Sequence, residues 1–94
     1  MIQSQNFTSV WEDIEDTPEE AENMKIRSSL MMNLQNHITK NKMTQAQAGA
    51  LFRVTQPRVS DLMRSRINLF AIDSLIDMAS AAGFRVEVKL RQVA

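Results

Sequence analysis

The side chains best suited to binding or chemistry lie on one predicted helix, which begins after Thr55. They avoid its apolar face, formed by Val59 and Leu62, and they are the polar residues Gln56, Arg58, Ser60, Asp61 and Arg64. Arginine pairs with guanine O6 and N7, glutamine pairs with adenine N6 and N7, and a carboxylate can accept from cytosine N4. The pattern therefore favours recognition of hydrogen-bonding surfaces such as base edges.

Catalytic chemistry has little support in the composition. The 94 residues include no cysteine and a single histidine, His37. The absence of cysteine excludes thiolate metal sites, cysteine nucleophiles and disulfides. A site centred on His37 would lack a second histidine. We expect a protein that is not an enzyme and that has no metal site and no cofactor.

Charge is balanced overall but uneven along the chain. Eleven basic and eleven acidic residues give a formal net charge of zero. Residues 1–24 contain seven acidic residues and no basic one, whereas residues 40–66 contain six basic residues against Asp61, a local balance of +5. Such asymmetry is the electrostatic pattern of a segment that binds a polyanion.

Two short helices joined by about three residues are predicted within the basic segment. Thr44 and Gln47 form a capping-box pattern before the first helix, and Thr55 caps the second, with Pro57 in its first turn. Small residues allow the helices to cross closely, and four apolar residues fill the seam: Ala46, Ala48 and Gly49, and then Leu51, Val54, Val59 and Leu62. This arrangement is typical of a helix-turn-helix.

Two further helices should support this pair. Thr17, Pro18 and Glu20 predict the start of a long helix that ends near Lys40, with a core face of Ile26, Leu30, Leu34 and Ile38. A polar break over 65–68 precedes a helix from about Ala71 to Ala82 that is followed by Gly83, a suitable C-terminal glycine. Its inward residues are predicted to be Ile72, Leu75, Ile76 and Ala79.

The two ends of the chain predict different elements. Residues 1–16 form an N-terminal arm with an apolar stripe of Phe7, Val10, Trp11 and Ile14, and residues 17–84 form the helix-turn-helix domain. Residues 85–94 form a dimerisation strand because apolar and charged residues alternate through Arg85, Val86, Glu87, Val88, Lys89 and Leu90. A single strand needs a partner, so we expect a homodimer in which two strands pair across a two-fold axis.

The segment from Met43 to Leu62 resembles the XRE (Cro/cI-type) helix-turn-helix, whose usual pattern is LTQ-x-x-A, a short turn and Q-x-x-(V/I)-S. The stretches 9–14 and 82–88, and Phe70 before Leu75, are similar to a subfamily associated with HigA-type antitoxins, which are encoded beside HigB/RelE-like toxins. The resemblance covers roughly residues 9–90 and implies a mostly all-α, lambda-repressor-like bundle of four to five helices. The sequence departs from the pattern at Arg53, where the family often has a glycine.

The resemblance and side-chain chemistry together imply a role for each polar residue of the motif. Gln56 matches the first glutamine of the family's recognition helix, and side-chain chemistry adds base contacts from Arg58, Ser60 and Asp61, of which Arg58 is the strongest candidate. Gln45 is placed, as in the family, for a phosphate contact or a bridging contact to the neighbouring helix, and we assign the other backbone contacts to Lys42, Thr44, Arg53, Arg64 and Arg66. Phosphate contacts of this kind orient a protein on duplex DNA but carry little sequence information.

Three functions remain compatible with these residues. The first is a dimeric repressor that is also the antitoxin of a toxin–antitoxin pair, with the acidic residues 12–22 docking a basic RelE-like toxin. The second is a stand-alone phage-like XRE repressor, and the third is a protein-interaction module that does not bind DNA. No apolar run approaches a membrane span and no signal peptide is recognisable, so the sequence predicts a cytoplasmic protein.

Overall fold

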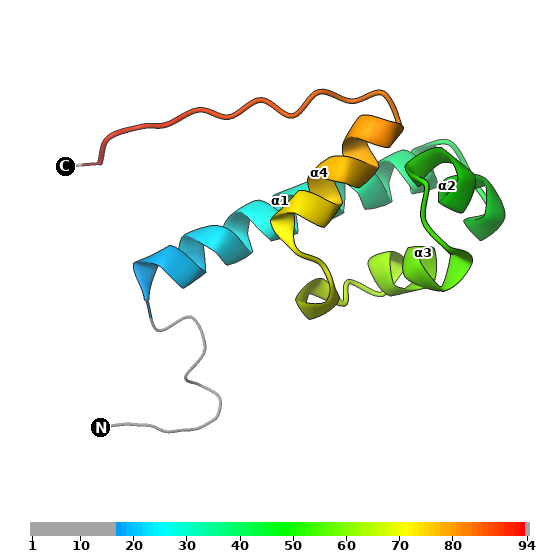
Figure 1. Cartoon of the computed structure of the whole chain (residues 1–94), viewed down its shortest axis with the longest axis horizontal. Coiled ribbons are helices and arrows are strands. Elements are labelled where there is room, and N and C mark those ends of the chain that lie inside the picture. The colour runs from blue at the N-terminus through cyan, green and yellow to red at the C-terminus, as the bar shows by residue number, and fades with distance from the viewer. Residues whose placement is uncertain (1–16, 94) are drawn as a thin grey trace, which may run out of the picture.

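The computed structural model describes residues 17–93, which form four α-helices and one short 3-10 helix (Figure 1). The elements are α1 (Pro18–Lys40), α2 (Gln45–Phe52), α3 (Gln56–Met63), η1 (Ile67–Leu69) and α4 (Ile72–Ala81). All four predicted α-helices are present with ends within one or two residues of those expected, which confirms the mostly helical class. The predicted N-terminal arm, residues 1–16, lies outside the described residues.

α1 begins where the sequence predicts, but its buried face is rotated from the expected one. The Thr17 hydroxyl accepts from the Glu20 backbone N–H at 3.0 Å and caps the helix. Met31, Leu34 and Ile38 are buried, whereas Ile26 is 45% exposed. Successive residues turn by about 100°, so a stripe spaced strictly by four drifts by about 40° at each step and has left the core side by Ile26.

One apolar core joins the four α-helices. Its largest fully buried side chains are Phe52, Phe70, Leu62, Leu75 and Val59. α4 packs on α1 and α2, and Figure 1 shows α2 and α3 grouped near the C-terminal end of α1. Among residues 17–93 no polar or charged residue is buried, so the core is held by apolar packing alone and the polar groups stay available at the surface.

The predicted polar break between α3 and α4 is an ordered connection. Ser65 adopts a left-handed conformation with φ 58°, and η1 follows with a hydrogen bond from the Phe70 N–H to the Ile67 carbonyl at 3.1 Å. Phe70 then enters the core with 1% of its surface exposed. The connection is therefore fixed at both ends, which determines where α4 begins.

α4 ends at the predicted glycine. Gly83 has φ 90°, and the Phe84 N–H bonds the Ala79 carbonyl at 3.0 Å, the arrangement of a Schellman cap. Leu75 and Ala79 are buried as predicted, but Ile76 is 36% exposed and Met78 takes the inward position instead.

After Gly83 the chain is extended, and within the described residues it forms no strand. Val86 packs against the core, whereas Val88 is 81% and Leu90 is 97% exposed. Figure 1 shows this segment leaving the end of α4 and running back in the direction of the N-terminal end of α1. The predicted strand is absent because a ladder needs a second strand, and the described part of this chain offers none.

Among residues 17–93 there is no helix with the length and apolar character required to cross a bilayer.

Candidate nucleic-acid interface

α2 and α3 are joined by only three residues, Arg53, Val54 and Thr55. Arg53 has φ 60° and ψ 45°, and the Val54 N–H bonds the Gly49 carbonyl at 2.9 Å. A Cβ atom at Gly49 would lie 2.8 Å from the Val54 carbonyl oxygen. The tight turn therefore needs a glycine at 49, and Arg53, which departs from the glycine of the XRE pattern, adopts the left-handed conformation.

Threonine hydroxyls cap both helices of the pair. The Thr44 side chain accepts from the Gln47 N–H at 3.1 Å, and the Gln47 side chain accepts from the Thr44 N–H at 2.9 Å. The Thr55 hydroxyl accepts from the Arg58 N–H at 3.3 Å. Both predicted caps are confirmed, and they fix the N-terminal turns of α2 and α3.

The seam between α2 and α3 is filled much as predicted. Ala48, Val59 and Leu62 are 0% exposed, while Leu51 and Val54 are half-buried against the core. Ala46 is exposed and does not contribute to the close approach. With Val59 and Leu62 turned inward, the outer face of α3 carries its polar residues together with the exposed Met63.

The four predicted base-contact residues do not share one environment. Gln56 is exposed at the first position of α3, and Ser60 and Asp61 are half-buried. Asp61 lies 3.7 Å from Arg66, measured from the carboxylate oxygen to Nη1. Asp61 is a predicted base contact and Arg66 is a predicted contact to the DNA backbone, so this ion pair joins one residue of each group.

Arg58 has intramolecular partners. Its Nη1 donates to the Leu69 carbonyl at 2.8 Å, and its guanidinium carbon lies 4.1 Å from the centre of the Phe70 ring. The side chain therefore joins α3 to the last residue of η1 and to Phe70 after it.

The predicted backbone-contact residues are all on the surface. Each belongs to an end of α1, α2 or α3, or to a connection next to one, and each is exposed: Lys42, Thr44, Gln45, Arg53, Arg64 and Arg66. Lysine and arginine at such positions can approach phosphates without opening the core. These assignments remain predictions.

Two polar residues of α1, neither of them predicted from the sequence as functional, form hydrogen bonds with the end of α3 and with the connection that follows it. Arg27 Nη1 donates to the Ile67 carbonyl at 3.2 Å and to the Phe70 carbonyl at 3.5 Å. Gln35 Nε2 donates to the Leu62 carbonyl at 2.7 Å and to the Ser65 hydroxyl at 2.9 Å. The sequence contains one signal for Arg27. It lies four residues before Met31, about one helical turn, so the two side chains lie on the same side of the helix.

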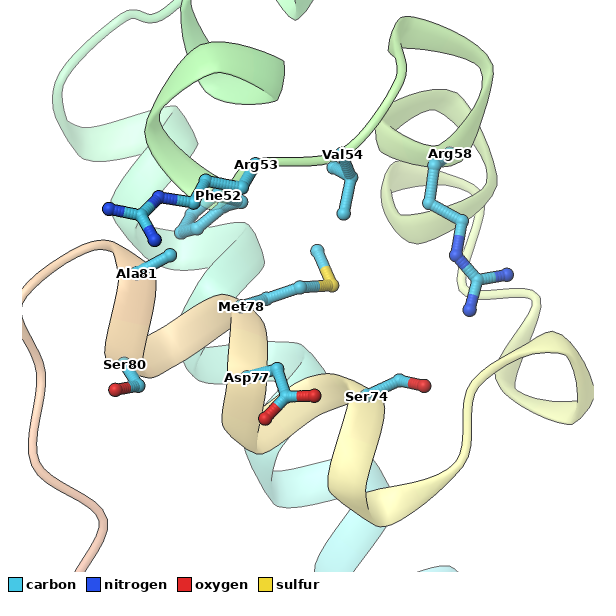
Figure 2. Close-up of a pocket in the computed structure, with 9 residues that line it drawn as sticks. All are labelled: Phe52, Arg53, Val54, Arg58, Ser74, Asp77, Met78, Ser80 and Ala81. Carbon is cyan, nitrogen blue, oxygen red and sulfur yellow. The ribbon is translucent and has the colours of Figure 1, made fainter.

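A hollow of about 610 Å³ lies between the turn and α4 (Figure 2). Figure 2 shows Arg53 and Arg58 on opposite sides of it, with Val54 between them and Ser74 and Asp77 contributed by α4. Both basic and acidic side chains line the hollow. One of them, Arg58, is the side chain that donates a hydrogen bond to the Leu69 carbonyl.

This geometry defines a helix-turn-helix protein: two short capped helices, a three-residue turn and an outward polar face. Residues 11–91 match the family model described as "Helix-turn-helix domain". The match covers most of the chain, and the protein belongs to this family.

One solved structure is similar over most of both chains. It is provisionally named as an XRE family transcriptional regulator, and it superposes with a TM-score of 0.70 at 27% identity over 78% of this chain and 82% of that chain. No curated protein matches the chain. The similarity supports the XRE resemblance read from the sequence.

Proposed function

We propose that this helix-turn-helix protein is a transcriptional regulator that binds a specific operator in duplex DNA. One observation carries the proposal: α3 is held by its apolar face and its Thr55 cap so that Gln56 is exposed at its N-terminal turn. A glutamine in that position can bond adenine N6 and N7 in the major groove. The similarity to a structure named as an XRE regulator supports the same function.

The surrounding charge fits the proposal. Exposed basic side chains lie before α2, in the turn and after α3, at Lys42, Arg53, Arg64 and Arg66. Neutralising phosphates at these positions would release counterions, so binding should weaken steeply with added salt. Since the net charge of the whole chain is zero, we expect non-specific binding to be weak and base contacts to matter.

Selection from a pool of random-sequence DNA duplexes tests this function. The wild-type protein should enrich one sequence, and the logarithm of its association constant for that duplex should fall linearly with the logarithm of the salt concentration. Gln56→Ala should lose preference at one base pair, at a cost of about 1–3 kcal/mol. Asn36→Ala, an exposed amide of α1, is the matched control and should bind as wild type. Failure to enrich any sequence would favour the interaction-module alternative.

We propose further that two copies pair through their C-terminal segments. Val88 and Leu90 are apolar yet almost fully exposed, and alternation places them on the same face as Val86. Antiparallel pairing of two such segments would cover these side chains and satisfy the free backbone groups. The resulting two-fold axis would present two α3 helices to half-sites about 34 Å apart.

Truncation after Glu87 tests the pairing while it keeps the Phe84 and Val86 contacts with the body. We expect a folded monomer by light scattering, with much weaker binding to a two-half-site duplex and unchanged binding to a single half-site. Removal of the whole segment, residues 84–94, should also abolish the dimer. A dimer that survives either deletion would contradict the pairing.

The narrower role of antitoxin remains a proposal, supported by the resemblance to the HigA-associated subfamily and by the acidic residues of the N-terminal stretch. A basic RelE-like toxin would be attracted to that stretch by charge complementarity. Deletion of residues 1–16 should then impair neutralisation of a toxin encoded beside this protein and leave operator binding unchanged. A small basic neighbouring reading frame would favour this role over that of a stand-alone repressor.

A further inference from the structure

The Arg58 guanidinium is held by two groups that follow α3 in the chain. Its Nη1 donates to the Leu69 carbonyl at 2.8 Å, and its guanidinium carbon lies 4.1 Å from the centre of the Phe70 ring. Phe70 is 1% exposed, so the guanidinium is one of the groups covering this ring. An arginine in this state uses its charge and its planar face at the same time.

Base reading would require Arg58 to leave both partners. A guanine edge would replace one hydrogen bond to a carbonyl with two hydrogen bonds to the base, but the Leu69 carbonyl and the Phe70 ring would lose their contacts. Much of the discrimination that a guanine contact offers would be offset by this loss. Gln56 would break no such contacts on binding a base, since it is exposed and no hydrogen bond from its side chain is found within residues 17–93.

The segment that Arg58 bonds is also bonded by a second arginine. Arg27 of α1 donates to the Ile67 and Phe70 carbonyls, at 3.2 Å and 3.5 Å. No side chain caps η1 at Arg66 or α4 at Ala71. Within residues 17–93, the side-chain hydrogen bonds to the carbonyls of Ile67, Leu69 and Phe70 come from two guanidiniums, one on α1 and one on α3.

We propose that Arg58 is a positioning residue, which fixes the orientation of α3 against η1 and α4 so that Gln56 and Ser60 can meet the bases. The proposal rests on the DNA-binding function above. It assigns to Arg58 a role different from the base contact that its chemistry predicts, because its side chain is directed at Leu69 and Phe70.

Two measurements on the free protein test the contact without DNA. Arg58→Ala should increase hydrogen exchange of the hydrogen-bonded backbone amides of Phe70 and Leu75 by about tenfold, because one charge-assisted bond is lost. Arg64→Ala, at the exposed residue that ends the same helix, is the matched control and should leave those amides unchanged. Arg58→Lys should recover part of the protection, since an ammonium can reach the carbonyl but cannot stack as a plane.

Three readouts on the duplex enriched by the wild-type protein separate positioning from direct contact. At a temperature where every variant is fully folded, Arg58→Ala should lower affinity by about tenfold, equivalent to about 1.4 kcal/mol. Its preference among single-base variants should keep the wild-type order at every position, and its salt slope should equal that of wild type. Arg64→Ala, a predicted phosphate contact, should instead reduce the salt slope by about 0.9 per protomer.

Each other result overturns the proposal. Loss of preference at one base pair would make Arg58 a base reader, a reduced salt slope would make it a phosphate contact, and unchanged affinity would make it merely structural. Unchanged hydrogen exchange in Arg58→Ala would show that the Arg58 contacts with Leu69 and Phe70 do not hold this connection. If the wild-type protein enriches no duplex, the proposed function fails, and the exchange measurement still decides whether Arg58 holds the connection.

Discussion

Arg53 occupies a backbone conformation that favours glycine, so replacing it should separate stability from DNA binding. The left-handed region costs a residue with a side chain roughly 1–2 kcal/mol. Arg53 has φ 60° and ψ 45°, in the middle of that region. Glycine relieves this cost but loses about 0.4–1 kcal/mol through the greater freedom of the unfolded chain. Arg53→Gly should therefore stabilise the protein by about 0.5–1 kcal/mol, or about 3–6 °C in Tm.

Arg53→Ala isolates the backbone contribution because alanine removes the guanidinium and keeps the left-handed cost. We expect its Tm within about 2 °C of wild type by calorimetry. Both variants should bind the selected duplex more weakly, with a salt slope reduced by about 0.9 per protomer, because both lose the same predicted phosphate contact. A Tm for Arg53→Gly at or below that of Arg53→Ala would refute the assignment of backbone strain to this turn.

Three further substitutions test other parts of the fold and site. Gly49→Ala places a Cβ 2.8 Å from the Val54 carbonyl and should destabilise by about 1–2 kcal/mol in urea titration, whereas exposed Ala50→Gly should lose only the helix-propensity difference of about 1 kcal/mol. Thr44→Ala removes the cap of α2 and should cost about 1 kcal/mol, and retention of full stability would contradict the capping box. Asp61→Asn removes an acid beside Arg66 and should tighten binding to random-sequence duplex at low salt, and weaker binding would indicate that the ion pair orders the interface.

Local signals in the sequence predicted the helices, their caps and the tight turn. Thr44, Thr55 and Gly83 act through neighbours three to five residues away, so the pattern that defines each cap lies within a short window. The left-handed conformation of Arg53 did not follow from such a pattern, because the sequence has an arginine where the family often has a glycine, and the structure shows it.

Contacts between distant segments were not predictable in this way. Arg58 has the chemistry of a base reader, and nothing in its own helix reveals a carbonyl eleven residues later at 2.8 Å. The burial of α1 depends on helical phase, which a run of residues spaced by four misrepresents at Ile26. A strand at 85–90 would need a partner that the described part of the chain does not supply, so the alternation of apolar and charged residues alone could not predict whether it pairs.

The two helices of the motif differ from the other two in the charge of their first turns. α1 begins with Glu19 and Glu20, and α4 has Asp73, whereas α2 and α3 have no acidic residue there. Both are capped by threonine, which is neutral, although aspartate caps a helix equally well. The partial positive charge at their N-termini is therefore left uncancelled on the side proposed to face phosphates. Because threonine hydroxyls do not titrate, the caps themselves add no negative charge to these two N-termini at any pH.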